Sequence, residues 1–406
     1  MSYIVPKPRK WKNYLRVSKK FHDLVLQYAD ISRLFRKKER VLHGYKSNHF
    51  FFIHLMTCSL DNVKNIKLLI KNRFCYHLSY VFTFACTYGL TEIVQFLVNN
   101  KIIDLTEHKD ALTLPSQYGH LDIVNLLLDE GVDPSVYNNE ALRLACRNGH
   151  VEIVQLLFDD TRVVAFEEDN EAIRFASLNG HTEIVKILLN KEVDPTAGEN
   201  EAIRIACKKG HYEIVKLLLK DERVDPSDYN NEAVENAIDK GHMKIVKYLF
   251  KHGIDPSFKN NYLLIKYCGK GNTSAVNFLL QYPTVDPSCQ NNKAITIACE
   301  LGYVDIVKLL LDDERVDPSV ENNFCIGLAC ENGYYEIAQM LLRDRRVNPA
   351  DDRNYALIHA CVNGHLDIVQ LLLGDLRVDP VVGIKPAIRN GNHEIANLLK
   401  KIKNFI

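Results

Sequence analysis

Histidine and cysteine are the side chains that most often carry acid–base, nucleophilic or metal chemistry, and both recur in this sequence at a regular spacing. Six histidines directly follow a glycine, and seven of the eleven cysteines stand three residues before a glycine. The two rows are His120, His150, His181, His211, His242 and His365, and Cys86, Cys146, Cys207, Cys268, Cys299, Cys330 and Cys361. Either row is a candidate for a metal site or a catalytic site.

The pattern around both rows argues against such a site. Tyr303 and Tyr334 take the place of the histidine without disturbing the pattern, so we interpret the histidines as surface residues at the start of a helix. The cysteines form no Cys-x2-Cys pair that would hold zinc. Successive cysteines are expected to lie beyond the roughly 4.4–6.8 Å Cα separation of a disulfide, so we interpret them as buried packing residues.

The composition points to an ordinary globular chain. Its 406 residues are 47% hydrophobic and 25% charged, with a net charge of zero. There is no H-E-x-x-H, Walker A or G-x-S-x-G motif, so we predict no catalytic residue, no cofactor and no bound metal. No apolar stretch approaches the about 18 residues of a membrane helix, and the N-terminus has no secretory pattern. We therefore expect an intracellular protein without a membrane span.

The histidine and cysteine rows belong to an internal repeat, and this repeat determines the secondary structure in which they lie. A glycine recurs at intervals of 30 or 31 residues, with a final interval of 27, at Gly89, Gly119, Gly149, Gly180, Gly210, Gly241, Gly271, Gly302, Gly333, Gly364 and Gly391. Intervals of this length indicate a repeat protein in which each copy is one supersecondary motif. The repeat therefore overrides the two or three domains that the length alone suggests.

Each repeat has the pattern of two short helices. Around Gly149, Leu142 and Ala145 give the first helix an apolar side, and Ile153 and Leu157 lie on an apolar stripe of the second. Gly149 ends the first helix, because glycine adopts a positive φ at low cost. An Asp-Pro-Ser loop precedes the next pair, since proline restricts the residue before it.

These features resemble the ankyrin repeat. Gly-His, Ile-Val and Leu-Leu pairs carry the resemblance in register over residues 46–406, in about twelve copies of which the first and last are degenerate or capping. The resemblance implies an all-α solenoid of stacked helix pairs with short loops. The short period, the Asp-Pro-Ser loops and the paired asparagines resemble the short-finger ankyrin repeat proteins of giant amoeba-infecting DNA viruses.

An asparagine also recurs at one position of eight successive repeats. We interpret it as structural, either as a helix cap or as a bond to the loop of the next repeat, and not as a ligand site. The row is Asn139, Asn170, Asn200, Asn231, Asn261, Asn292, Asn323 and Asn354.

Residues that vary between repeats are the candidates for recognition. In the ankyrin family a concave groove between the loop tips and the first helices binds partner proteins, and the resemblance implies the same here. The partner-binding residues that we predict at these places are Tyr137, Arg143, Arg147, Glu168, Arg174, Arg204, Lys208, Lys209, Tyr229, Lys259 and Lys270.

The charge of the predicted groove changes along the chain. Arg143, Arg174 and Arg204 share one position in three successive repeats, and the same zone turns acidic from Glu300 to Glu331. Complementary charge steers association, so we hypothesise a partner with an acidic segment against the middle repeats. The alternative is a solvated surface whose charges have no partner.

Residues 1–40 differ from the rest of the chain, with 12 basic and 3 acidic residues. Apolar residues at helical spacing from Phe21 to Phe35 predict a cap, so we assign residues 1–45 to a basic segment and helical cap, and residues 46–406 to the repeat array. Basic residues around Trp11 leave open a nucleic-acid-associated function. A further alternative is an adaptor that delivers a partner to another complex, such as a ubiquitin ligase. We expect a monomer in the cytoplasm or nucleus, of a host cell if the protein is viral.

Overall fold

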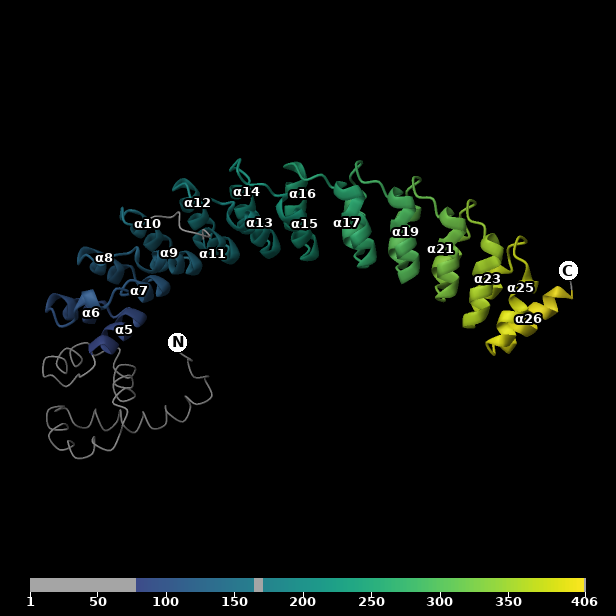
Figure 1. Ribbon diagram of the computed structural model, residues 1–406, viewed down its shortest axis with the longest axis horizontal. Coiled ribbons are helices and arrows are strands. Elements are labelled where there is room, and N and C mark those ends of the chain that lie inside the picture. The colour runs from purple at the N-terminus through teal and green to yellow at the C-terminus, as the bar shows by residue number, and fades with distance from the viewer. Residues whose placement is uncertain (1–77, 164–170, 405–406) are drawn as a thin grey trace, which may run out of the picture. The chain divides into compact units, whose positions relative to one another are not determined.

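A computed structural model describes residues 78–163 and 171–404 of the chain (Figure 1). These ranges contain 22 α-helices, one 3₁₀ helix and no strand, which confirms the predicted all-α solenoid. The predicted cap at residues 1–45 lies outside the described residues. The chain divides into two compact units, of which unit 1 ends at Asp194 and unit 2 begins at Pro195.

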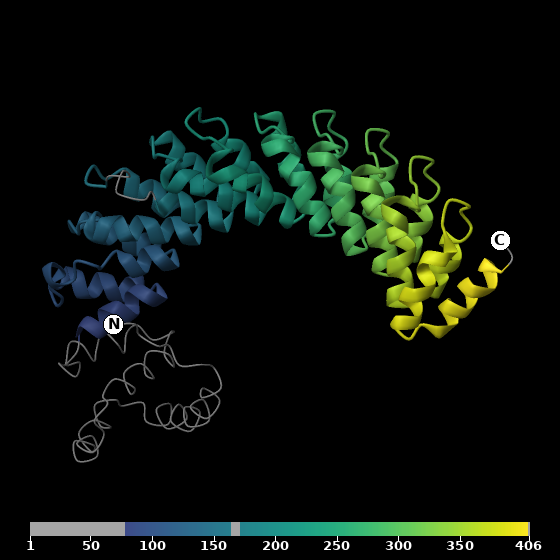
Figure 2. The same cartoon turned by 45° about the vertical axis from the view of Figure 1, so that its right-hand side comes forward.

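Unit 1 contains four described helix pairs. The first helix of each pair packs against the first helix of the next pair, and the second helices do the same (Figure 2). The pairs are α5 (Leu78–Tyr88) with α6 (Thr91–Asn99), α7 (Thr113–Tyr118) with α8 (Leu121–Asp129), α9 (Val136–Asn148) with α10 (Val151–Phe158), and α11 (Glu171–Asn179) with α12 (Thr182–Asn190); the 3₁₀ helix η2 (Leu105–Glu107) precedes α7.

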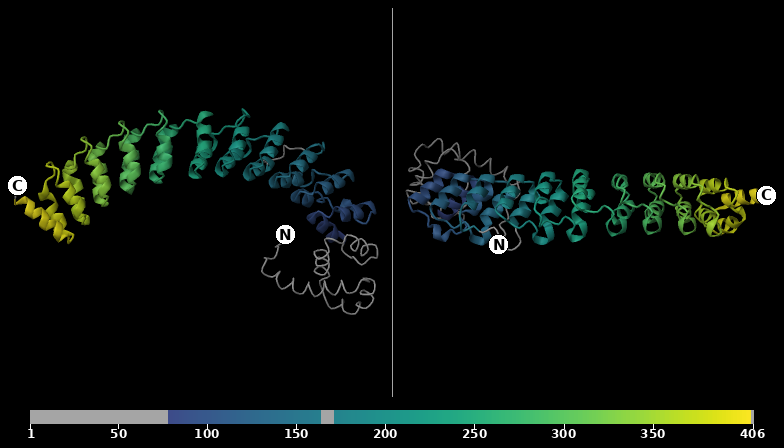
Figure 3. Two further views of the ribbon diagram at one scale, coloured as in Figure 1. Left: turned by 180° about the vertical axis from the view of Figure 1, so that it is seen from behind. Right: turned by 90° about the horizontal axis from the view of Figure 1, so that it is seen from above.

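Unit 2 contains seven helix pairs arranged in the same two layers (Figure 3). They are α13 (Ala197–Lys209) with α14 (Tyr212–Leu218), α15 (Asp228–Asp239) with α16 (Met243–Lys251), α17 (Phe258–Gly269) with α18 (Thr273–Leu279), α19 (Cys289–Leu301) with α20 (Val304–Leu311), α21 (Val320–Glu331) with α22 (Tyr335–Leu341), α23 (Asp351–Asn363) with α24 (Leu366–Leu372), and α25 (Pro380–Arg389) with α26 (His393–Lys403).

The apolar stripes predicted from the repeat form the core. In the α19–α20 pair, Ile295 and Ala298 of the first helix and Ile306, Val307 and Leu310 of the second are fully buried. One helix pair cannot bury this surface alone, so each repeat depends on its neighbours for its core.

Among the described residues, seven first helices have three successive residues in the left-handed conformation near their start: α9, α13, α15, α17, α19, α21 and α23. In α19 these are Gln290, Asn291 and Asn292, with φ values of 52°, 60° and 57°. This conformation costs about 1–2 kcal/mol per residue for most side chains, and asparagine tolerates it best. The left-handed turn explains why paired asparagines recur before the helices.

The recurring asparagine bonds to the next repeat. Asn292 is 6% exposed, and its Oδ1 accepts the backbone N–H of Asp317 at 2.8 Å. Asn261 accepts the N–H of Asp286 in the same way, at 2.9 Å. Of the two structural roles predicted for this row, the bond to the next repeat is therefore confirmed at these positions. The helix cap is wrong for them, because these asparagines accept from the next loop and not from their own helix.

An Asp-x-Arg pair closes several of the loops, a feature not predicted from the sequence. Arg315 donates to both carboxylate oxygens of Asp313, at 3.0 and 2.7 Å, and to the carbonyl of Val285 in the preceding repeat at 3.0 Å. The hydrogen bonds from Arg315 hold the pKa of Asp313 below its usual value. The pair ties one loop to the loop before it.

The histidine or tyrosine ring that follows most of the repeat glycines is also a contact between repeats. The Nε2 of His150 lies 3.0 Å from the carbonyl oxygen of Gln117, and a Cβ added to Gly119 would stand 2.6 Å from the His150 ring. Tyr303 lies against Gly271 in the same way. His150 stands directly before α10, at the start of the second helix as predicted, but it is half-buried and contacts the preceding repeat.

Two glycines of unit 1 separate the cost of the backbone conformation from the cost of this contact. Gly119 and Gly131 both have φ +82°, but Gly131 has nothing within 4 Å of an added Cβ. We expect Gly131→Ala to lower the free energy of unfolding by about 1–2 kcal/mol. Gly119→Ala should cost about 1–3 kcal/mol more, because the His150 ring must move. Urea denaturation measures both, and equal losses would show that the ring contact contributes nothing.

Candidate functional site

The left-handed turns and the solvent-facing side of the first helices form one kind of surface, called here the first-helix face. Ten of the eleven predicted partner-binding residues belong to it, and Glu168 lies outside the described residues. The face is described separately for each unit.

In unit 1, Arg143 is engaged within the protein. Its guanidinium donates to the carbonyls of Tyr137 and Asn138, at 3.1 and 3.0 Å, and pairs with Glu171 at the start of the next first helix. Arg143 thus satisfies the carbonyl groups of the left-handed turn and ties two repeats together. The side chain of Tyr137, at the tip of the turn, is 60% exposed.

Arg204 has the same role in unit 2. It donates to the carbonyls of Gly198 and Glu199, at 2.9 and 3.1 Å, and pairs with Glu232 of α15. Its guanidinium carbon lies 4.5 Å from the centre of the Tyr229 ring, which is a cation–π contact. The arginine side chain is only 15% exposed. Both arginines therefore brace the turn, and their charges are compensated.

The remaining predicted residues differ in how far they are engaged. Arg147 is exposed and lies over the ring of Phe175, 5.2 Å from its centre, and Arg174 is half-buried on α11. Lys259 donates to the side chain of Asn230 at 2.7 Å. Lys270 pairs with Asp239 at 2.8 Å; burial would raise the pKa of Asp239, but this ion pair lowers it below its usual value.

Three lysines supply the exposed positive charge at this end of unit 2. Lys208 and Lys209 end α13, and Lys240 follows α15. All three are exposed, and none contacts a carboxylate among the residues that the structure describes. These lysines are available to a partner, in contrast to Arg143 and Arg204.

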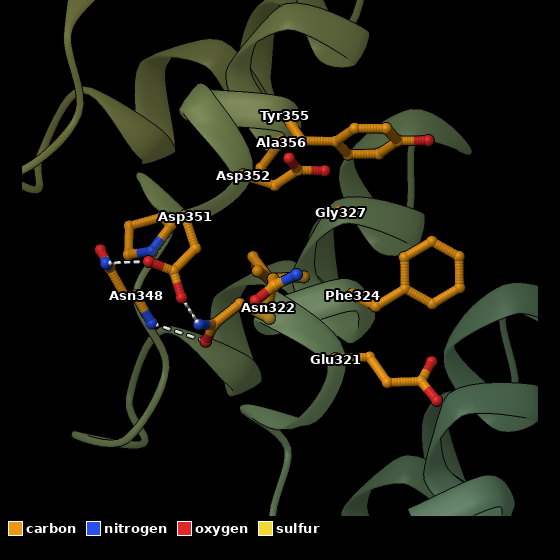
Figure 4. Close-up of a pocket in the computed structure, with 12 residues that line it drawn as sticks. Glu321, Asn322, Phe324, Gly327, Asn348, Asp351, Asp352, Tyr355 and Ala356 are labelled. Carbon is orange, nitrogen blue, oxygen red and sulfur yellow. Dashed lines mark hydrogen bonds between the residues drawn. The ribbon is translucent and has the colours of Figure 1, made fainter.

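The first-helix face changes character at α21 and α23, where it contains a cleft that was not predicted (Figure 4). Phe324 and Tyr355 occupy the position at which earlier repeats have Glu140 and Glu201. Figure 4 shows the two rings on either side of Gly327. Phe324 is 38% exposed, and the acidic residues Glu321, Asp351 and Asp352 line the same cleft.

Gly327 makes room for this cleft. It stands in the middle of α21, where α9 and α13 have Arg143 and Arg204, and a Cβ there would lie 2.8 Å from the Tyr355 ring. Glycine weakens a helix interior, so its presence requires a reason, and the close approach of the ring supplies one. The departure of Gly327 and Phe324 from the repeat pattern was the signal that could have located the cleft.

Tyr355 is held in a fixed orientation. Its hydroxyl donates to Glu331 at 2.8 Å, and its ring stacks on His359 with 4.0 Å between centres. Burial and the bond to Glu331 raise the pKa of Tyr355 to about 12. Glu321, at the edge of the cleft, accepts from Asn291 at 2.9 Å. The cleft is thus preformed.

The cysteine row has the packing role that was predicted. All seven members are buried free thiols, and burial raises the pKa of Cys86, Cys268 and Cys361 to about 12. Thiols buried in apolar surroundings are poor nucleophiles at neutral pH. Within residues 78–163 and 171–404, no group of three histidine, cysteine or acidic residues is placed to hold a metal ion.

Comparison with protein-family profiles identifies the repeat. A family profile described as ankyrin repeats (3 copies) matches residues 53–138, 136–199, 175–260, 258–322 and 314–384, which together cover well over half of the chain. No curated protein matches it. In the part of the chain that the structure describes, no helix is both long and apolar enough to span a membrane.

Arg204 and Lys208 lie one helical turn apart and test the distinction between a brace and an available charge. Arg204→Ala should lower the free energy of unfolding by about 1.5–3 kcal/mol, because it removes charge-assisted hydrogen bonds to two carbonyls and a carboxylate. Lys208→Ala should change it by less than about 0.5 kcal/mol. Urea denaturation of the two variants measures this, and a similar small effect for both would contradict the bracing role.

Proposed function

Because the chain belongs to the ankyrin repeat family, whose repeats are generally protein–protein interaction modules, we propose that it binds a partner protein through the first-helix face and has no catalytic activity of its own. The proposal rests on one observation: the residues that recur from repeat to repeat differ in role from the residues that vary between repeats. Gly119, His150 and Asn292 represent the constant rows and bond one repeat to the next. Lys208 and Phe324 represent the variable positions and are exposed.

The first-helix face of unit 2 offers two kinds of contact. Lys208, Lys209 and Lys240 provide positive charge on α13 and α15, and Phe324 and Tyr355 provide apolar surface on α21 and α23. Buried aromatic contacts contribute most of the binding energy at protein interfaces, whereas exposed charges mainly steer association. A partner with acidic residues toward the lysines and an apolar side chain in the cleft would bind in one direction only.

We keep the prediction that the partner has an acidic segment, but we propose that other residues of this chain bind it. The carboxylates of Glu171 and Glu232 already compensate Arg143 and Arg204. Among the described residues, Lys208, Lys209 and Lys240 have no such compensation, in contrast to Lys270, which pairs with Asp239. We assign the acidic segment to Lys208, Lys209 and Lys240.

We further propose that the protein acts inside a cell. The nine described cysteines are all free thiols, a state that reducing compartments maintain. Origin from a giant virus, the choice between cytoplasm and nucleus, and the monomeric state stay predictions from the sequence. The alternatives of nucleic-acid binding through residues 1–40 and of an adaptor for another complex also stay predictions.

Affinity capture with the tagged full-length chain from nuclease-treated lysate tests the proposal. The captured set should be depleted by the double variant Lys208→Glu with Lys209→Glu, and separately by Phe324→Ala. We expect a loss of about 1–2 kcal/mol in binding for Phe324→Ala, about five- to thirtyfold in affinity, because it removes an aromatic anchor.

The control is Lys308→Glu, which reverses an exposed charge on the second helix α20. It should leave the captured set unchanged. The proposal is wrong if neither variant of the first-helix face depletes any protein that the Lys308→Glu variant retains.

A further inference from the structure

The second helix α16 departs from the repeat pattern in its charge. In nine of the eleven described second helices an acidic residue occupies the first turn, three positions after the repeat glycine: Glu92, Asp122, Glu152, Glu183, Glu213, Asp305, Glu336, Asp367 and Glu394. In α16 this position is Lys244. A positive charge in the first turn of a helix opposes the helix dipole, so the dipole gives no reason for a lysine at this position.

Two more lysines continue this surface along α16. Lys244, Lys247 and Lys251 are all exposed, and α16 contains no acidic residue. Their spacing of three and four residues places them on one side of the helix, about 4.5 and 6 Å apart along its axis. In the neighbouring α14, Lys216 adds a fourth positive charge and pairs with Glu213 at 3.0 Å.

Aromatic rings hold these lysines in place. The ammonium groups of Lys244 and Lys216 lie 3.9 and 5.7 Å from the centre of the Tyr212 ring. Lys247 lies 5.8 Å from the centre of the Phe278 ring on α18. Glu213 is the only acidic residue in α14, α16 and α18. The lysines thus form a surface of positive charge that is almost uncompensated by its own helices; we call Lys216, Lys244, Lys247 and Lys251 the α16 basic surface.

We propose that the α16 basic surface binds the phosphate backbone of a nucleic acid. This site lies on the second helices and is separate from the protein-binding role of the first-helix face. Lysine ammonium groups bind phosphate as point charges, and a row of them with little compensating charge supplies sequence-independent affinity. A lysine in place of the usual acidic residue is a departure of the kind found at functional sites.

The rings argue against an acidic peptide as the occupant. Tyr212 packs edge-on against Tyr248 with 5.6 Å between ring centres, and Tyr248 stacks on His252 at 3.9 Å. None of the large apolar side chains exposed in the structure belongs to α14, α16 or α18. Peptide recognition depends on buried apolar anchors, whereas binding to a phosphate backbone requires only positive charge. The surface fits the second case.

Fluorescence anisotropy with a labelled single-stranded oligonucleotide of thymidines tests the proposal on the full chain at several salt concentrations. The test variant carries Lys244→Glu, Lys247→Glu and Lys251→Glu. The control carries Lys308→Glu, Lys400→Glu and Lys401→Glu, which changes the net charge equally at exposed positions of α20 and α26.

The test variant should bind at least about tenfold more weakly than the control at low salt. The negative slope of log affinity against log salt should become shallower by about 2. Equal binding by the two triple variants would overturn the proposal, because nucleic-acid affinity would then follow net charge or residues 1–40. Binding of poly-glutamate as tight as that of the oligonucleotide, and lost in the test variant, would also overturn it in favour of an acidic protein.

The single variant Lys244→Glu separates binding from stability. It restores the acidic residue of the repeat pattern, so the urea midpoint should stay the same or rise while oligonucleotide affinity falls. A lower midpoint with unchanged affinity would mean that Lys244 serves only to pack on Tyr212, and would contradict the proposed site.

Discussion

The contact between a repeat glycine and the ring of the following repeat is the constraint that recurs most often between the described repeats. It is present at Gly89, Gly119, Gly149, Gly210, Gly271, Gly302 and Gly333 and absent at Gly241. Gly119 has a positive φ and ends its helix, and the absence of a Cβ lets the His150 ring reach the carbonyl of Gln117. The same position is filled by Tyr303 against Gly271 in unit 2. The contact joins two neighbouring repeats beside the C-terminal end of a first helix.

The polar residues of this chain have two different roles. Some bond one repeat to the next, and others remain available to a partner. Asn292 and Arg204 look like candidates for recognition by their chemistry, yet both satisfy backbone groups of the left-handed turns or of the next loop. A left-handed turn built from residues other than glycine has a high conformational energy. It therefore persists only where surrounding side chains bond to its backbone groups. The residues left for partners are those that the repeat does not need, such as Lys208 and Phe324. In a repeat protein, specificity can change at these positions while the stacking of the repeats is preserved.

The sequence predicts the stacking well and the recognition surface in part. The helix pairs, the buried thiols and the loop bond of Asn292 follow from residues that recur, because periodicity reports what every copy needs. The three-residue left-handed turn does not follow, since side-chain patterns do not report φ directly. The pairing of Arg204 with Glu232 and the contact of Gly327 with Tyr355 also need the structure, because each joins two repeats. Departures from the repeat pattern, such as Gly327 and Lys244, were visible in the sequence. They indicate positions whose role differs from the stacking of the repeats.

The most direct test of the central claim is hydrogen–deuterium exchange of the full chain, alone and saturated with a captured partner. If the first-helix face is the binding surface, protection should appear in peptides that cover α13, the turn before α15, and α21 with the start of α23. The second helices α20 and α22 should exchange as in the free protein. Protection confined to second helices or to residues 1–40, with no change in α13 or α21, would contradict the account.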